Sequence, residues 1–250
     1  MNTEYHSWWS THLEREMELK VYGTGGKPLV VFPCAGGRFF EFEDFGMVET
    51  VRPFLEEGRL QVYTVDSVDR DAWLALGKWP GDRAWRHEQY DAYIAQEVVP
   101  FIRSHNGTAD RVMATGNSMG AYHAANMLFR HPDLFDTCIS LSGLYGPEYF
   151  VGAYRDEHIE AHFPLLYLPQ CTDPVRLEAY RQCTIIICVG QGAWEEMHIR
   201  ETRLLQQVLE QLEIPAWVDY WGYDVSHDWP WWRRQLPYFI RHCLEGQPSR

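Results

Sequence analysis

A serine between two glycines, in the segment Gly116-Asn117-Ser118-Met119-Gly120, is the residue of this sequence best suited to nucleophilic chemistry. The preceding residues Arg111–Thr115 predict a strand, and Met119–Arg130 predict a helix. A tight turn between a strand and a helix exposes a serine hydroxyl at the edge of a sheet, and the glycines leave room for that turn. The short pattern alone is common, so its position between strand and helix carries the prediction that Ser118 is a nucleophile.

A serine hydroxyl is a weak nucleophile, so it needs a histidine base and an acid that orients the base. Seven histidines follow Ser118: His123, His131, His158, His162, His198, His227 and His242. Only His227 lies in a predicted loop directly after a strand (216–221) and before the last helix (231–243). The other six fall within or at the end of predicted helices, or in an irregular region. We therefore predict that His227 is the base.

The acid is expected at the end of the predicted strand 184–189, where the chain reads Gly190-Gln191-Gly192-Ala193-Trp194-Glu195-Glu196. This segment contains no aspartate, so the acid is a glutamate. Glu195 is the first candidate and Glu196 the alternative, while Asp224 is a third and weaker one. A carboxylate in the first turn of a helix is also favoured by the helix dipole, which is the structural explanation for one of the two glutamates.

Two backbone N–H groups are needed to stabilise an oxyanion during attack on a carbonyl. The N–H of Met119, at the start of the helix after Ser118, is the first. The second is expected from the loop 33–40 after the predicted strand 28–32, with Ala35 as first candidate and Gly36 as alternative. Cys34 in the same loop has no neighbour in sequence that would activate it, and we interpret it as a packing residue.

Strands and helices alternate along most of the chain, which predicts an α/β fold with a mostly parallel central sheet and helices on both faces. Residues 11–22 predict an edge strand, and 87–104 a helix with regularly spaced apolar residues. Further strands are predicted at 28–32, 60–65, 111–115, 137–141, 184–189 and 216–221, and further helices at 119–130, 196–212 and 231–243.

The length of 250 residues fits one domain spanning the whole chain, 1–250. Residues 143–182 interrupt the alternation with many aromatic residues and four prolines. Loops of this length in a compact domain usually have a function. The segment is expected to form either a cap over the site or a structural excursion that covers an edge of the sheet.

The overall charge excludes two classes of partner. With 22 basic and 35 acidic residues the net charge is −13, which disfavours binding to nucleic acid or to anionic membranes. The chain has no apolar stretch long enough to span a bilayer and no signal-peptide pattern at its start. The six cysteines form no CxxC pair and are expected to be reduced core thiols of a cytoplasmic protein. No metal and no organic cofactor is implied.

Three segments together resemble the esterase branch of the α/β hydrolases, which includes esterase D (S-formylglutathione hydrolase) and the mycobacterial mycolyltransferases. They are Gly116–Gly120, Gly190–Glu196, and Ser226-His227-Asp228-Trp229 followed by Trp232 and Leu236. The resemblance covers about residues 11–244. It implies an α/β-hydrolase fold with Ser118, one glutamate and His227 as the catalytic triad. Relatives of esterase D have an aspartate at the position of Glu195, whereas mycolyltransferases use a glutamate that aligns nearer Glu196.

These observations predict a serine hydrolase that cleaves carboxylic esters or thioesters through an acyl-enzyme. One alternative is an acyltransferase with the same triad, and another is a catalytically silent binding protein on a hydrolase scaffold. The aromatic residues Phe39, Phe40 and Trp194, close to the predicted site in sequence, favour a small ester substrate of apolar or aromatic character.

Overall fold

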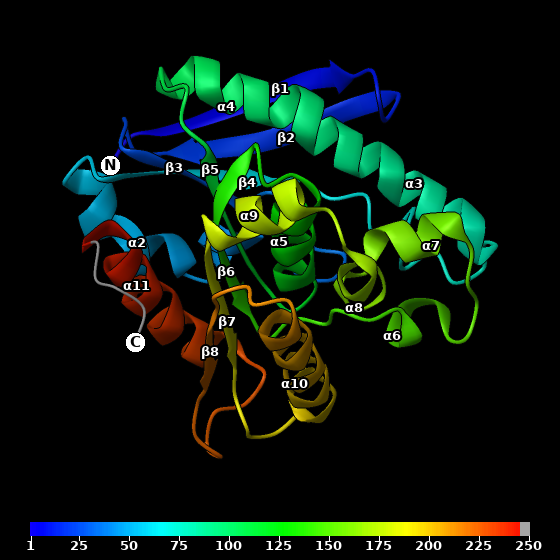
Figure 1. Ribbon diagram of the computed structural model, residues 1–250. Coiled ribbons are helices and arrows are strands. Elements are labelled where there is room, and N and C mark those ends of the chain that lie inside the picture. The colour runs from blue at the N-terminus through cyan, green and yellow to red at the C-terminus, as the bar shows by residue number, and fades with distance from the viewer. Residues whose placement is uncertain (246–250) are drawn as a thin grey trace.

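The computed structural model, which describes residues 1–245, is built on one eight-stranded sheet (Figure 1). The strand order is β1-β2-β4-β3-β5-β6-β7-β8. β1 pairs antiparallel with β2, and β2 antiparallel with β4, while every other pair is parallel. The strands are β1 (Thr3–Ser10), β2 (Arg15–Tyr22), β3 (Lys27–Phe32), β4 (Leu60–Val65), β5 (Val112–Asn117), β6 (Phe135–Leu141), β7 (Thr184–Val189) and β8 (Trp217–Tyr220). The mostly parallel sheet predicted from the sequence is therefore confirmed.

The N-terminal part of the chain differs from its prediction. Residues 11–22 do not form one edge strand, because Thr11–Glu14 make a turn and only Arg15–Tyr22 form a strand. The edge strand is instead β1, which lies in the part of the chain before the predicted strand. The turn closes through Glu14, whose φ of 51° is unusual for a residue other than glycine, asparagine or aspartate. No residue typical of such a turn marks it in the sequence.

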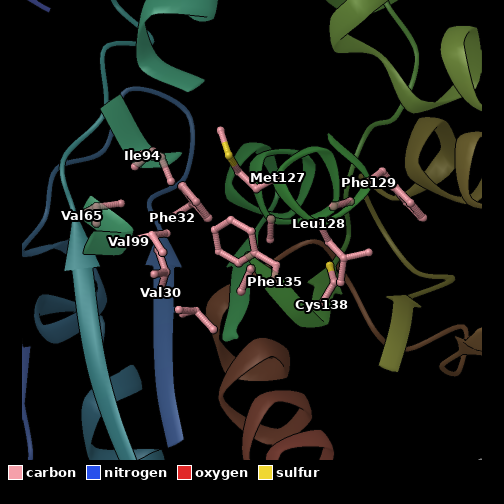
Figure 2. Close-up of a cluster of buried hydrophobic side chains, with 14 of the residues drawn as sticks. Val30, Phe32, Val65, Ile94, Val99, Met127, Leu128, Phe129, Phe135 and Cys138 are labelled. Atoms are coloured by element: carbon pink, nitrogen blue, oxygen red, sulfur yellow. The ribbon is translucent and has the colours of Figure 1, made fainter. Parts of the chain in front are cut away.

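Two layers of helices cover the sheet. Successive residues of β3 point to opposite faces, so that Val30 and Phe32 join one core cluster and Leu29 and Val31 the other. The first cluster lies beneath α3 (Pro80–Tyr93), the π-helical turn η1 (Ile94–Val98), α4 (Val99–Asn106), α5 (Met119–Arg130) and α10 (Glu196–Gln211). Figure 2 shows part of it, including Val30, Phe32, Ile94 and Met127. The second cluster lies beneath α1 (Glu41–Asp44), α2 (Met47–Glu56) and α11 (Trp229–Glu245).

Most of the predicted helices are present with small shifts of their ends. The helix expected at 87–104 begins earlier, at Pro80, whose fixed φ and missing N–H suit the first helical turn. The helices α1 and α2 were not predicted. α2 buries Met47, Val51 and Phe54 against the sheet, although it contains Pro53.

The segment 143–182 forms short helices instead of a long loop. These are α6 (Glu148–Val151), α7 (Glu157–His162), α8 (Pro164–Tyr167), η2 (Leu168–Gln170) and α9 (Pro174–Arg181). The segment is held at its start by Glu201, which accepts hydrogen bonds from the N–H groups of Tyr145 and Gly146. Further along, Phe150 and Phe163 pack with Trp73, Tyr122 and Met119, so that the segment lies against α3 and α5 (Figure 1).

None of the helices in residues 1–245 is both long and apolar enough to cross a bilayer.

Candidate active site

Ser118 lies between the end of β5 at Asn117 and the start of α5 at Met119. Its backbone has φ 55° and ψ −118°, a conformation that non-glycine residues adopt only where the surroundings enforce it. The two glycines enforce it by close packing. A Cβ on Gly116 would lie 2.3 Å from the carbonyl carbon of Gly120, and a Cβ on Gly120 would lie 2.3 Å from the carbonyl oxygen of Phe32. The turn therefore requires glycine two residues before and two residues after Ser118.

His227 lies in the loop between β8 and α11, as predicted. Its Nδ1 is 3.2 Å from Oε2 of Glu195, and its backbone N–H donates to the carbonyl of Ala193 at 3.0 Å. The Trp232 ring and the His227 imidazole also pack edge to face, with ring centroids 4.9 Å apart. The loop 190–195 and the loop that carries His227 thus hold each other in place.

The glycines of the segment 190–192 allow that approach. Gly192 N–H donates to the carbonyl of Val225 at 2.8 Å. A Cβ on Gly190 would lie 2.2 Å from the same carbonyl oxygen, and one on Gly192 would lie 2.8 Å from the carbonyl carbon of Val225. Any side chain at these two positions would push away Val225, which lies in the loop two residues before His227.

Glu195 is the glutamate that the structure brings to His227. Its side chain is completely buried, whereas Glu196 is exposed at the first position of α10. Asp224 is exposed too, and no hydrogen bond joins it to His227 among residues 1–245. Glu195 therefore makes the contact with His227, whereas Glu196 lies in the first turn of α10.

Ser142, a residue that the sequence did not single out, holds the second oxygen of Glu195. Its hydroxyl donates to Oε1 at 2.6 Å and accepts a hydrogen bond from Nε1 of Trp232 at 3.3 Å. The residue follows β6 directly and has a φ of 57°, with its N–H bonded to the carbonyl of Cys188 at 2.8 Å. A serine just after a predicted strand was the only signal in the sequence, and serines at strand ends are common.

His198, on α10, is a second histidine beside Glu195 and His227. Its ring stacks on that of His227 with centroids 4.1 Å apart, and its Nδ1 is 3.5 Å from Oε2 of Glu195. Burial, with a smaller contribution from the nearby His227, lowers the pKa of His198 to about 3, so that it is neutral at physiological pH. The sequence places His198 one helical turn after Glu195, but the helical position alone gave no reason to choose it.

The loop after β3 is held by neighbours that leave two of its N–H groups free. The N–H of Cys34 donates to Oε2 of Glu41 at 2.7 Å, and Arg70 donates to the carbonyl of Gly36. The N–H groups of Ala35 and Gly36 have no acceptor within residues 1–245.

The N–H of Met119, at the first position of α5, has no acceptor within its own helix. Glu41 was not predicted, because it is only one of several acidic residues between 41 and 49.

Cys34 does not have the surroundings of a reactive thiol. Burial, with the nearby carboxylate of Glu41, raises the pKa of the Cys34 thiol well above its ordinary value. A protonated thiol is a poor nucleophile, which supports the interpretation of Cys34 as a packing residue.

The aromatic residues singled out from the sequence differ in exposure. Phe39 is buried and packs against Tyr5, with ring centroids 5.8 Å apart. Phe40 is exposed, and Trp194, directly before Glu195, is 79% exposed. Two further aromatic residues, Phe45 and Trp229, stack with centroids 4.3 Å apart.

Comparison with known proteins assigns the chain to a protein family. Residues 10–242 match the family model described as "Putative esterase". The chain belongs to this esterase family. It is therefore an enzyme of the hydrolase class, and the family supports an activity on carboxylic esters.

Solved structures agree with this esterase in fold at low sequence identity. The S-formylglutathione hydrolase of Agrobacterium tumefaciens is 16% identical, with a TM-score of 0.76 over 97% of this chain and 94% of that one. MPT51 of Mycobacterium tuberculosis is 14% identical, with a TM-score of 0.76 over the whole of both chains. The ferulic acid esterase Fae1A of Anaeromyces mucronatus, in complex with ferulic acid, is 13% identical, with a TM-score of 0.69 over 96% and 89%. The α/β-hydrolase fold and the family expected from the sequence are confirmed.

Proposed function

We propose that this esterase hydrolyses carboxylic esters or thioesters through an acyl-enzyme on Ser118, with His227 as the base and Glu195 as the acid of the triad. The observation that carries the proposal is the 3.2 Å contact between Nδ1 of His227 and Oε2 of the buried Glu195. A carboxylate bonded to one imidazole nitrogen fixes the tautomer in which the other nitrogen is free to accept a proton.

The reaction then runs in two balanced halves. Nε2 of His227 takes the proton of Ser118 as Oγ attacks the ester carbonyl, and the imidazolium that forms is stabilised by Glu195. The proton passes to the leaving alcohol or thiol when the bond between the carbonyl carbon and that group breaks. Water then gives a proton to His227 and attacks the acyl-enzyme. The bond between the acyl carbon and Oγ of Ser118 breaks as His227 returns the proton to Oγ, which releases the acid and restores both residues.

Backbone N–H groups are proposed to stabilise the oxyanion in both halves. The N–H of Met119 is one donor, and the N–H of Ala35, with Gly36 as the alternative, is the other. The support is that, within residues 1–245, none of the three N–H groups has a backbone acceptor that it would have to give up. Removing one such donor typically lowers kcat by about 10²–10³.

The substrate is proposed to be a small ester with an apolar or aromatic acyl group. The exposed rings of Phe40 and Trp194 offer aromatic surface near Ala35 and Glu195 in the chain. The likeness to an esterase that was solved with ferulic acid, an aromatic acid, agrees with this choice. A panel of aryl and alkyl esters with acetyl, butyryl and cinnamoyl groups would rank the acyl preference.

Labelling with a fluorophosphonate probe and ester hydrolysis together test the proposal. The wild-type enzyme is expected to be labelled and active, and Ser118→Ala to be neither, with unchanged folding by circular dichroism. A folded wild-type enzyme that is not labelled would instead favour a silent binding protein. Product analysis with an added alcohol or amine distinguishes hydrolysis from acyl transfer, since a transferase would form the new ester or amide in preference to the free acid.

A further inference from the structure

A second cluster of chemistry-bearing side chains lies at the N-terminal edge of the sheet. Glu4 and His6 are two residues apart on β1 and so lie on the same face of the strand. His105 is in the last turn of α4, which runs across β1 and β2 (Figure 1). Oε2 of Glu4 is 3.1 Å from Nε2 of His6 and 3.0 Å from Nε2 of His105.

A chain of hydrogen bonds fixes which nitrogen of His105 carries a proton. Nε2 of Gln61 donates to the carbonyl of Gly23 at 3.2 Å, so Oε1 of Gln61 must be the oxygen that faces Tyr63. That oxygen can only accept, and the Tyr63 hydroxyl therefore donates to it at 2.7 Å. The Tyr63 oxygen is then the acceptor for Nδ1 of His105 at 3.0 Å, and Nδ1 carries the hydrogen.

The remaining nitrogen of His105 consequently points its lone pair at a carboxylate. In the neutral ring Nε2 is an acceptor, and Oε2 of Glu4, 3.0 Å away, is an acceptor as well. Two acceptors at this distance repel each other unless a proton or a metal cation lies between them.

The donor set and its spacing suit a metal ion. One carboxylate and two imidazoles are a common ligand set for Zn²⁺, and donors about 2.0–2.1 Å from a tetrahedral ion lie about 3.3 Å from one another. The three ligand atoms here all lie within 4.8 Å of one another. The bond from His105 to Tyr63 is the kind of outer partner that fixes the tautomer of a metal-binding histidine. Nε2 of His6 can donate to Glu4 in the neutral ring, so the contact between His105 and Glu4 is the one that needs a cation, and a metal ion placed there can take Nε2 of His6 as a third ligand.

We propose that Glu4, His6 and His105 form a binding site for a divalent transition metal, Zn²⁺ above all, which fastens the edge strand β1 to the end of α4. The side chains are 20–37% exposed, which leaves a fourth coordination position for water. The sequence does not imply such a site, because His105 lies about one hundred residues from the other two ligands.

The test must exclude Zn²⁺ at the other cluster, since Glu195, His198 and His227 also gather ligand atoms within 4.8 Å. We would therefore measure binding in a His227→Ala background, by titration calorimetry with Zn²⁺ and by the visible absorption of bound Co²⁺. One metal ion per chain is expected, together with a rise in Tm of roughly 5–10 °C at a free Zn²⁺ concentration about 100 times Kd.

Matched variants then assign the site. In the same background, His6→Ala and the nearly isosteric Glu4→Gln are expected to weaken binding at least tenfold and to remove the shift in Tm. His12→Ala, in the turn of the same hairpin, is expected to bind as tightly as the parent. Absence of tight binding in the folded His227→Ala enzyme would overturn the proposal, as would equal affinities of His6→Ala, Glu4→Gln and His12→Ala.

Discussion

The hydroxyl of Ser142 donates to Oε1 of Glu195 at 2.6 Å, on the side of the carboxylate opposite to His227. The two residues come from adjacent strand ends, Ser142 from β6 and Glu195 from the loop after β7. A buried carboxylate with one oxygen bonded to a serine and the other to an imidazole cannot rotate without losing a hydrogen bond. The contact therefore fixes the plane of the carboxylate that His227 faces.

We predict that Ser142→Ala lowers kcat/KM about tenfold. Without the Ser142 hydroxyl the carboxylate of Glu195 can rotate, and part of its hydrogen bond to His227 is lost. A hydrogen bond to a charged group contributes about 1.5–3 kcal/mol. The measurement is steady-state hydrolysis of an aryl ester. Ser140→Ala is the control, since Ser140 is equally buried on β6 but bonds to the carbonyl of Ala121 and to Tyr145. A loss of activity in Ser140→Ala as large as in Ser142→Ala would show a general effect of repacking.

The two neighbouring glutamates provide a second prediction. Glu195→Gln is expected to lower kcat by about 10²–10⁴, because an amide no longer stabilises the imidazolium and can favour the wrong tautomer of His227. Glu196→Gln, exposed at the start of α10, is expected to stay within about twofold of wild type. Kinetics of the two variants with one substrate decide between them, and a greater loss in Glu196→Gln would move the acid by one residue.

A third prediction concerns Gly190. An added Cβ at this position would lie 2.2 Å from the carbonyl oxygen of Val225, so Gly190→Ala must displace the chain that leads to His227. We expect more than a tenfold fall in kcat and a loss of about 1–3 kcal/mol in the free energy of unfolding, the usual range for overpacking. Gly77→Ala is the control, since a Cβ there would meet no atom of residues 1–245 within 4 Å. Wild-type kcat in Gly190→Ala would mean that the His227 loop tolerates displacement.

The parts of the site that sequence predicts are those determined by local geometry. Gly116 is required by a contact within the turn and Gly120 by the approach of the turn to β3, and both belong to the short pattern around Ser118. The position of His227 after a strand follows from chain order in the fold. Ser142 and His198 could not be found in this way, because each acts on Glu195 across the fold. What selects them is the pairing of β6 with β7 and the direction in which α10 leaves the loop, neither of which has a signature in the sequence.

The secondary-structure elements also differ in how well the sequence predicts them. The buried parallel strands appear as continuous apolar runs, and β7 has the predicted bounds Thr184–Val189. β1 was missed because its more buried positions are mostly polar, with Glu4 and His6 beside Trp8, so no alternation of apolar residues marks the strand. The helices within 143–182 were missed because four of the five elements are at most six residues long, too short for a helical period to appear.

Acid stability provides the last prediction, through His198. Its pKa is lowered to about 3 in the folded protein, mainly by burial, whereas an exposed histidine has an ordinary value of 6.5. As the pH falls below 6.5 the unfolded chain takes up a proton at this residue and the folded chain does not, so stability is lost between about pH 6.5 and pH 3. At pH 5 the loss from this one group is about 2 kcal/mol, since one pKa unit corresponds to about 1.4 kcal/mol.

We therefore expect His198→Gln, which has no titrating ring, to lose about 2 kcal/mol less than wild type in the free energy of unfolding between pH 8 and pH 5. Urea unfolding of both proteins at the two pH values measures this difference, and a change in stability common to both pH values cancels from it. Because glutamine cannot stack on His227 as an imidazole does, the variant could also be less stable at pH 8 without affecting the comparison. If the two proteins lost the same free energy on acidification, His198 would have to be protonated in the folded enzyme, beside His227 and within 3.5 Å of Glu195.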